Sequence, residues 1–198
     1  MKFLTCLLLL LLPLLIFAQQ EEPTFGGRAI DVNLIADVGG AIGLSSIAWS
    51  DDRKTPVTPL YSLGGELLFT TRYAGIGIRA DFVFGNIRYS ANASENIDFF
   101  TPSYSFVLAM QPVEHLVFTA GPVYAEVVLD PLDLPVSNFL LADHFWGLSF
   151  TTDYALEKWI LGVRTYVGLQ PIIRLGGTPQ EVTGRLRSFQ LKVGYNLL

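Results

Sequence analysis

An alternation of apolar and polar residues with a period of two is the feature of this sequence that most constrains its fold. From about residue 28 onward the alternation recurs in segments of roughly ten residues, divided by turn residues. Segments of this kind suit strands whose two faces meet different surroundings. Past the N-terminal apolar run, no window of about 18 consecutive apolar residues occurs, which excludes helical membrane spans. The pattern predicts an all-β protein.

The connections between the segments alternate in length. Those near 71–74, 111–114 and 155–158 are short, whereas four others are long: 47–59, 90–98, 129–143 and 175–184. Outer-membrane barrels show the same asymmetry, with short periplasmic turns and long outer loops. We therefore expect a closed eight-stranded antiparallel up-and-down transmembrane β-barrel with both termini in the periplasm. Its strands are predicted near 29–44, 60–70, 75–88, 99–110, 115–128, 144–154, 159–172 and 185–197.

The fifth predicted strand contains a proline. Pro122 interrupts the apolar face formed by Leu116, Phe118, Ala120 and Tyr124. Proline cannot donate a ladder hydrogen bond, and within sheets it is found at edges and bulges. We therefore expect a β-bulge at Pro122.

Composition supports a membrane protein and excludes other classes. Hydrophobic residues make up 51% and charged residues only 16% of the chain, whereas about a quarter of the residues of a soluble protein are charged. The formal net charge of −5 offers nothing to nucleic acid. The single cysteine, Cys6, lies in the N-terminal apolar run, so the rest of the chain has neither disulfides nor thiolate metal ligands.

The N-terminus has the pattern of a secretory signal peptide. Lys2 supplies the positive charge, an apolar stretch runs from Leu4 to Ile16, and Ala18 precedes polar residues. An uncleaved anchor is the alternative, but the run is shorter than the roughly 20 residues of a spanning helix and Pro13 interrupts it. We expect a signal peptide over 1–18, export through the Sec pathway, a short periplasmic segment over 19–27, and the barrel over 28–198.

Aromatic residues on the apolar face decide which side of the wall meets lipid. A soluble lipocalin-like barrel alternates too, but it points its apolar side chains inward. Here the aromatic residues gather near both ends of the predicted strands, which fits the two girdles of a membrane barrel better than a ligand cavity. The predicted girdles are Tyr61, Tyr104 and Trp146 at the outer end, and Phe69, Tyr73, Tyr154, Trp159 and Tyr195 at the periplasmic end.

The opposite face predicts a polar interior. It carries charges of both signs, which need partners when buried. If the turn between the second and third strands is centred between Arg72 and Tyr73, Glu66 and Arg79 stand opposite each other. Eight strands leave room only for side chains, so we expect this network to fill the lumen, with a narrow conduit for small or hydrophobic solutes as the alternative. The predicted network is Glu66, Arg79, Asp81, Asp153, Arg164 and Lys192.

The final strand, Phe189-Gln-Leu-Lys-Val-Gly-Tyr195-Asn-Leu-Leu198, looks like the C-terminal signal read by the barrel-assembly machinery, with the apolar positions Phe189, Leu191, Val193, Tyr195 and Leu197. With this strand, the chain resembles the small eight-stranded outer-membrane barrels of Gram-negative bacteria, the OmpA/OmpX-like class. The resemblance implies a place in the cell outer membrane, contact with its lipid, and periplasmic chaperones and the assembly machinery as partners during biogenesis. Members of this class serve as structural links, adhesion factors, conduits or lipid A-modifying enzymes, so the fold does not select a role.

The residues themselves give little support to catalysis. Of the two histidines, His115 follows Glu114 and His144 follows Asp143, and neither assembles a convergent ligand set, so we expect no metal and no cofactor. A palmitoyltransferase-like group of Asp143, His144 and Ser137 or Ser149 is the weaker alternative. The loop over 129–143 is apolar for a loop and could contact a protein or lipid partner. We predict a structural or interaction barrel and not an enzyme.

Overall fold

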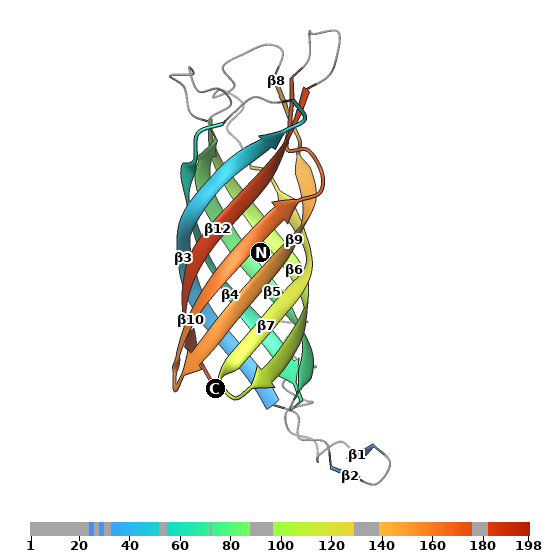
Figure 1. Cartoon of the computed structure of the whole chain (residues 1–198), viewed down its shortest axis with the longest axis vertical. Helices are drawn as coiled ribbons and strands as arrows, with labels where there is room; N and C mark the ends of the chain where they lie inside the picture. Colours follow the sequence, from blue (N-terminus) through green and yellow to red (C-terminus); the bar gives the residue numbers. More distant parts are fainter. Residues whose placement is uncertain are drawn as a thin grey trace, which may run out of the picture. The chain divides into compact units, whose positions relative to one another are not determined.

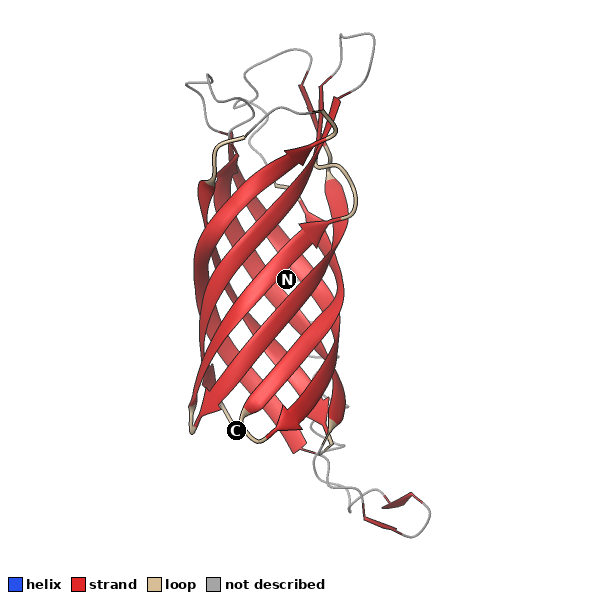
Figure 2. Cartoon of the chain, in the orientation of Figure 1, coloured by secondary structure: helices blue, strands red, loops and turns tan. Residues whose placement is uncertain are grey.

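The structure, a computed structural model, describes residues 24–25, 28–29, 33–51, 55–71, 73–87, 97–128, 139–175 and 182–198. Its regular structure is entirely β (Figure 2). No helix among the described residues is long and apolar enough to cross a membrane. Eight long strands form the barrel: β3 (Asn33–Trp49), β4 (Thr58–Thr70), β5 (Ala74–Ile87), β6 (Ile97–Val113), β7 (Leu116–Glu126), β9 (His144–Leu156), β10 (Trp159–Gly168) and β12 (Val182–Asn196).

The sheet is closed and antiparallel. Each strand pairs with its neighbours in the order β10-β9-β7-β6-β5-β4-β3-β12, and β12 pairs back with β10. Figure 1 shows the strands tilted around the barrel. Closure leaves these strands without a free edge, which is what a sheet needs in lipid because no water is present to satisfy unpaired backbone groups. The predicted all-β, eight-stranded, up-and-down barrel is confirmed.

Two further short elements pair beyond the barrel wall. β11 (Ile173–Leu175) pairs with the start of β12, and β8 (Phe139–Leu141) pairs with β11. Separately, β1 (Thr24–Phe25) and β2 (Arg28–Ala29) form a two-stranded sheet within a unit of its own. The predicted signal peptide over 1–18 lies outside the described residues.

Short turns connect the strands at one end of the barrel, and the strand ends that are joined by the long connections lie at the other (Figure 1). Two of the short turns place a non-glycine residue in the left-handed region, His115 with φ 68° and Glu157 with φ 52°. A positive φ of this kind closes tight hairpins. Asn196 of β12 pairs with Asp37 of β3, so the last strand ends where the first begins, on the side of the short turns.

The predicted strand boundaries needed adjustment. β3 occupies Asn33–Trp49 instead of 29–44, and β10 stops at Gly168 instead of continuing to 172. Beyond β10 the chain leaves the ladder, and Leu169 donates its backbone N–H to the carbonyl of Trp146. The alternation extends beyond the true strand ends at Asn33 and Gly168, whereas β3 extends beyond the clear alternation after Leu44, so periodicity alone did not locate these boundaries.

The bulge predicted at Pro122 was wrong. Pro122 stands opposite Leu148 in an unbroken register with β9, and the register between β7 and β6 holds on both sides of it. The irregularity lies in β6 instead, between Met110 and Val113, a stretch that contains another proline, Pro112. Neither proline has a backbone N–H to donate to the neighbouring strand, but the register shifts only at Pro112, which lies beside a tight turn.

Candidate functional site: the barrel interior

The barrel interior has three layers. An apolar cluster lies near the short turns, where Leu68, Val107 and Ala109 are buried and Ile35 and Val117 pack against them. A larger apolar cluster lies near the long connections: Ile47, Leu60, Phe99, Ala125, Phe145, Ile172, Ile173 and Leu186. Between the two clusters stand the charged side chains. The lumen is therefore apolar at both ends and ionic in the middle.

Glu66 and Arg79 form the first ion pair of the middle layer. They are directly opposite each other in the register of β4 and β5, as the hairpin geometry predicted. Both side chains are almost fully enclosed, and the Arg79 guanidinium contacts a Glu66 carboxylate oxygen. Arg79 also donates from Nη2 to the hydroxyl of Thr119 on β7, two strands away in the sheet, at 3.0 Å.

Lys192 connects two further carboxylates. Its Nζ lies 2.9 Å from Oδ2 of Asp153 and 3.2 Å from Oδ2 of Asp37. These residues belong to β12, β9 and β3, so the ammonium ties together strands that are far apart in the sequence. Asp37 was not among the predicted network residues. The signal that could have found it is its position on the polar face of the first predicted strand.

Arg164 and Asp81 form another ion pair of the middle layer, with Nη1 of Arg164 3.0 Å from Oδ2 of Asp81. β10 and β5 are not neighbours in the sheet, so this pair spans the lumen. With it, all six sequence-predicted interior residues are buried and engaged in ion pairs.

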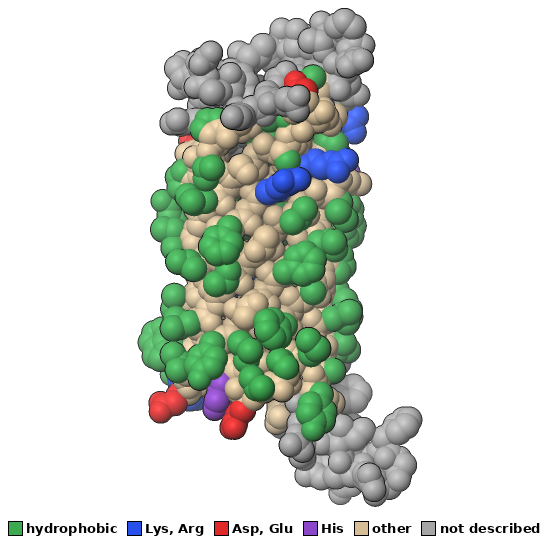
Figure 3. Space-filling view, viewed as in Figure 1, with side chains coloured by type: hydrophobic (Ala, Val, Ile, Leu, Met, Phe, Trp, Pro, Cys, Tyr) green, Lys and Arg blue, Asp and Glu red, His purple; other side chains and the backbone are tan. Residues whose placement is uncertain are grey.

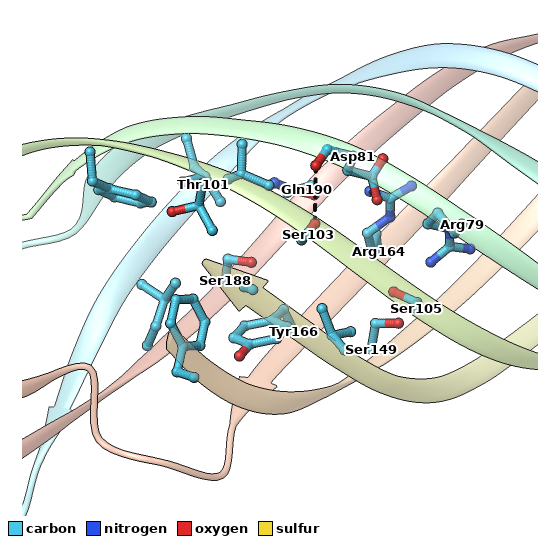
Figure 4. Close-up of a pocket in the computed structure, with 17 residues that line it drawn as sticks. Arg79, Asp81, Thr101, Ser103, Ser105, Ser149, Arg164, Tyr166, Ser188 and Gln190 are labelled. Carbon is cyan, nitrogen blue, oxygen red and sulfur yellow. Dashed lines mark hydrogen bonds and ion pairs between the residues drawn. The ribbon is translucent and has the colours of Figure 1, made fainter. Parts of the chain in front are cut away.

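A cavity separates the charged layer from the larger apolar cluster. Figure 4 shows Arg79, Asp81 and Arg164 together on one side, with the hydroxyls of Ser188 and Tyr166 farther along. Apolar side chains such as Phe99 and Phe145 complete the lining. Some buried polar atoms around it have no protein partner, among them the hydroxyls of Thr101, Ser149 and Tyr166. Such a space suits ordered water or a small polar group.

Three carboxylates, those of Asp37, Glu66 and Asp153, lie as close together as the ligands of a metal site. Their oxygens, however, already face basic groups, since Lys192 contacts both aspartates and Arg79 contacts Glu66. We assign no metal to this cluster.

The two histidines lie apart from this interior. His144 is exposed on the outer wall of β9, whereas Ser149 on the same strand is buried inside the barrel. A group combining His144 with Ser149 is thus excluded, because the two side chains are on opposite faces of one strand. The alternative partner, Ser137, lies outside the described residues. His115 is exposed at a short turn, with Nε2 3.6 Å from Glu114.

The outer wall is apolar. Figure 3 shows hydrophobic side chains spread over the face in view between the two ends of the barrel. Leu63 is 61% exposed and Leu108 58%, whereas Lys192 is 4% exposed. This inverts the arrangement of a soluble protein and shows that the predicted lipid-facing side was assigned correctly.

Aromatic side chains are grouped near both ends of this wall. Trp159 and Tyr195, near the short turns, meet edge to face with ring centroids 5.4 Å apart. Toward the long connections, Tyr104, Tyr124 and Trp146 stand in one cross-strand row. The other predicted girdle residues, Tyr61, Phe69, Tyr73 and Tyr154, are exposed or partly exposed. Tyr124 is not among the predicted girdle residues, although it lies on the predicted apolar face of its strand.

The five apolar positions of the predicted assembly signal all face outward on or just after β12: Phe189, Leu191, Val193, Tyr195 and Leu197. Between them, Gln190 and Lys192 point inward. A closed barrel with an apolar, aromatic-rimmed exterior is the structure that satisfies the backbone in lipid. The protein is an integral outer-membrane β-barrel protein.

Comparisons with known proteins find similarity in solved structures. No family model matches the chain, and no curated protein matches it. Neisserial surface protein A is 13% identical with a TM-score of 0.48, over 84% of this chain and 99% of that one. The outer membrane protein AlkL is 13% identical with a TM-score of 0.43, over 89% and 97%. Ail, the attachment invasion locus protein of Yersinia pestis, solved with a heparin analogue, is 10% identical with a TM-score of 0.44, over 82% and 99%.

Proposed function

We propose that this protein is a structural or interaction-type barrel of the outer membrane, with a closed interior and with its outer loops as the contact surface. The observation that carries the proposal is the closure of the lumen by side chains. The ion-paired side chains of the middle layer are enclosed by apolar clusters at both ends. An ion entering this lumen would have to displace paired charges in a space that eight strands leave only wide enough for side chains.

The proposal includes no catalytic role. The exposed His144 is separated by the wall from the buried hydroxyls of β9, and the acidic cluster inside the barrel is occupied by basic side chains. The partners we propose are outer-membrane lipid, the assembly machinery and periplasmic chaperones during biogenesis, and a protein or lipid at the outer loops.

Planar-bilayer recording of the folded, detergent-purified protein tests the closed interior. We expect no reproducible conductance steps from the native protein. As a positive control, shortening both arginines in R79A/R164A removes two cations of the middle layer, and we expect this variant to leak. Conductance steps from the native protein that vanish when the sample is unfolded by boiling would overturn the closed-lumen proposal.

A second candidate function is a narrow conduit for small or hydrophobic solutes. The cavity favours it, because the side nearer the long connections is lined by Leu60, Phe99, Phe145 and Leu186. The test is solute entry into vesicles that contain the protein, measured by the swelling of the vesicles. Entry of solute would support this function. Filling the cavity with A125F would then be expected to slow entry, while the outward-facing control A80F would leave it unchanged.

A further inference from the structure

Two arginines stand on the lipid-facing side of β12, near its outer end. Arg185 and Arg187 are exposed, while Leu186 and Ser188 point into the barrel. Residues two apart on one strand face are separated by about 7 Å. The two guanidinium groups therefore project side by side from one strip of the outer wall, and Figure 3 shows basic side chains gathered at this level on the face in view.

The apolar belt fixes the depth of this pair in the membrane. Phe189, the next outward position toward the short turns, is 52% exposed, and the apolar positions continue from there to Leu197. Five successive outward positions of an inclined strand cover most of the roughly 25 Å apolar band of such barrels. Arg187 comes directly after the last apolar position, so both arginines are at the level of the lipid headgroups.

Among the described residues, the strands on either side of these arginines place no acidic side chain opposite them. No ion pair or side-chain hydrogen bond to Arg185 or Arg187 occurs among the described residues. Their cross-strand neighbours are neutral: Ala48 and Ser46 on β3, and Val167 on β10. Within the described strands, the exposed acidic side chains are Asp98 and Glu126, on β6 and β7, which do not adjoin β12, and the exposed Asp51 lies two residues beyond the end of β3.

We propose that Arg185 and Arg187 bind the phosphate groups of an anionic lipid of the outer leaflet and hold that lipid beside β12. A guanidinium presents its donors in a planar fork that matches phosphate oxygens. Two forks about 7 Å apart can engage one phosphate together or two phosphates of one headgroup. The acyl chains of the same lipid would then lie along the apolar strip that begins at Phe189.

Native mass spectrometry of the full, detergent-purified protein titrated with lipid A tests this site. We expect the native protein to retain lipid A, and R185Q/R187Q to bind it at least about tenfold more weakly, since hydrogen bonds to charged groups contribute at this scale. The variant R185K/R187K keeps the charge but loses the planar fork of donors. Its affinity for lipid A should lie between those of the native protein and R185Q/R187Q. The control K158Q removes one exposed cation at the opposite end and should change nothing.

Two outcomes would overturn the lipid site. One is unchanged lipid A retention by R185Q/R187Q, in a sample whose heat-dependent gel shift shows that it is folded. The other needs no variant: retention of dephosphorylated lipid A as strong as that of lipid A by the native protein. Retention of phosphatidylcholine at the same level belongs to this second outcome, because it too would show that the acyl chains alone account for binding.

Discussion

The two faces of a single strand of this barrel differ strongly in the exposure and the polarity of their side chains. On β12, Gln190 and Lys192 are 3% and 4% exposed, whereas their neighbours Leu191 and Val193 are 55% and 48% exposed. In water, this arrangement would leave the charges desolvated and the apolar surface hydrated. It is stable because the solvent on the outer side is hydrocarbon, and because the inner charges have one another as partners. The comparison shows that the polarity of the side chains on each face of a strand matches the surroundings of that face.

Breaking an inner ion pair should have the largest effect. We expect R79A to lower the free energy of unfolding by about 3–5 kcal/mol, because it leaves the enclosed Glu66 carboxylate without its partner. The measurement is urea unfolding of the protein in lipid vesicles, followed by tryptophan fluorescence. The double variant E66L/R79M should recover most of this loss. If R79A were no less stable than the outward control T165A, the inner charges would not depend on one another.

Charging the outer face should have the next largest effect, and the effect should depend on depth. L191R places a guanidinium within the apolar belt, so we expect it to cost about 2–4 kcal/mol, against about 0–1 kcal/mol for L197R near the interface. The same unfolding assay compares the two. Equal costs at the two positions would contradict the placement of the apolar belt.

The close packing of the inner face can be tested at a glycine. A Cβ at Gly147 would collide with the hydroxyl and the ring of Tyr166, whereas a Cβ at Gly40, on the outer side, has 3.3 Å to its nearest neighbour. We expect G147A to cost about 1–3 kcal/mol by overpacking, and G40A to cost less. A G147A protein as stable as G40A would show that the Tyr166 ring moves freely within the cavity.

The smallest expected effect concerns the aromatic girdle. Trp159 and Tyr195 meet edge to face, an arrangement with a coupling of about 0.5–1.5 kcal/mol beyond area burial. A double-mutant cycle of W159L, Y195L and W159L/Y195L in the unfolding assay measures this coupling. A coupling of zero would mean that the two rings act only through their separate contacts with lipid.

The sequence was sufficient to predict features that depend on residues close together along the chain. The alternation and the connection lengths predicted eight strands, their order and the inward or outward direction of their side chains. The Glu66–Arg79 pair was predictable because a tight turn fixes the register of the two strands that it joins. The bulge expected at Pro122 is absent, and the register shift lies at Met110–Val113 instead. The presence of a proline in a strand does not show whether the neighbouring strands can accommodate it.

The sequence by itself determined the class of the fold, the membrane-facing side of each strand and which residues enter the lumen, because these follow from a period of two along one chain. Only the tertiary structure decided which charges meet. Lys192 reaches Asp37 over 155 residues, and Arg164 reaches Asp81 over 83. Those contacts depend on how the eight strands are staggered when the sheet closes. The stagger is a property of the whole barrel, and no single segment encodes it.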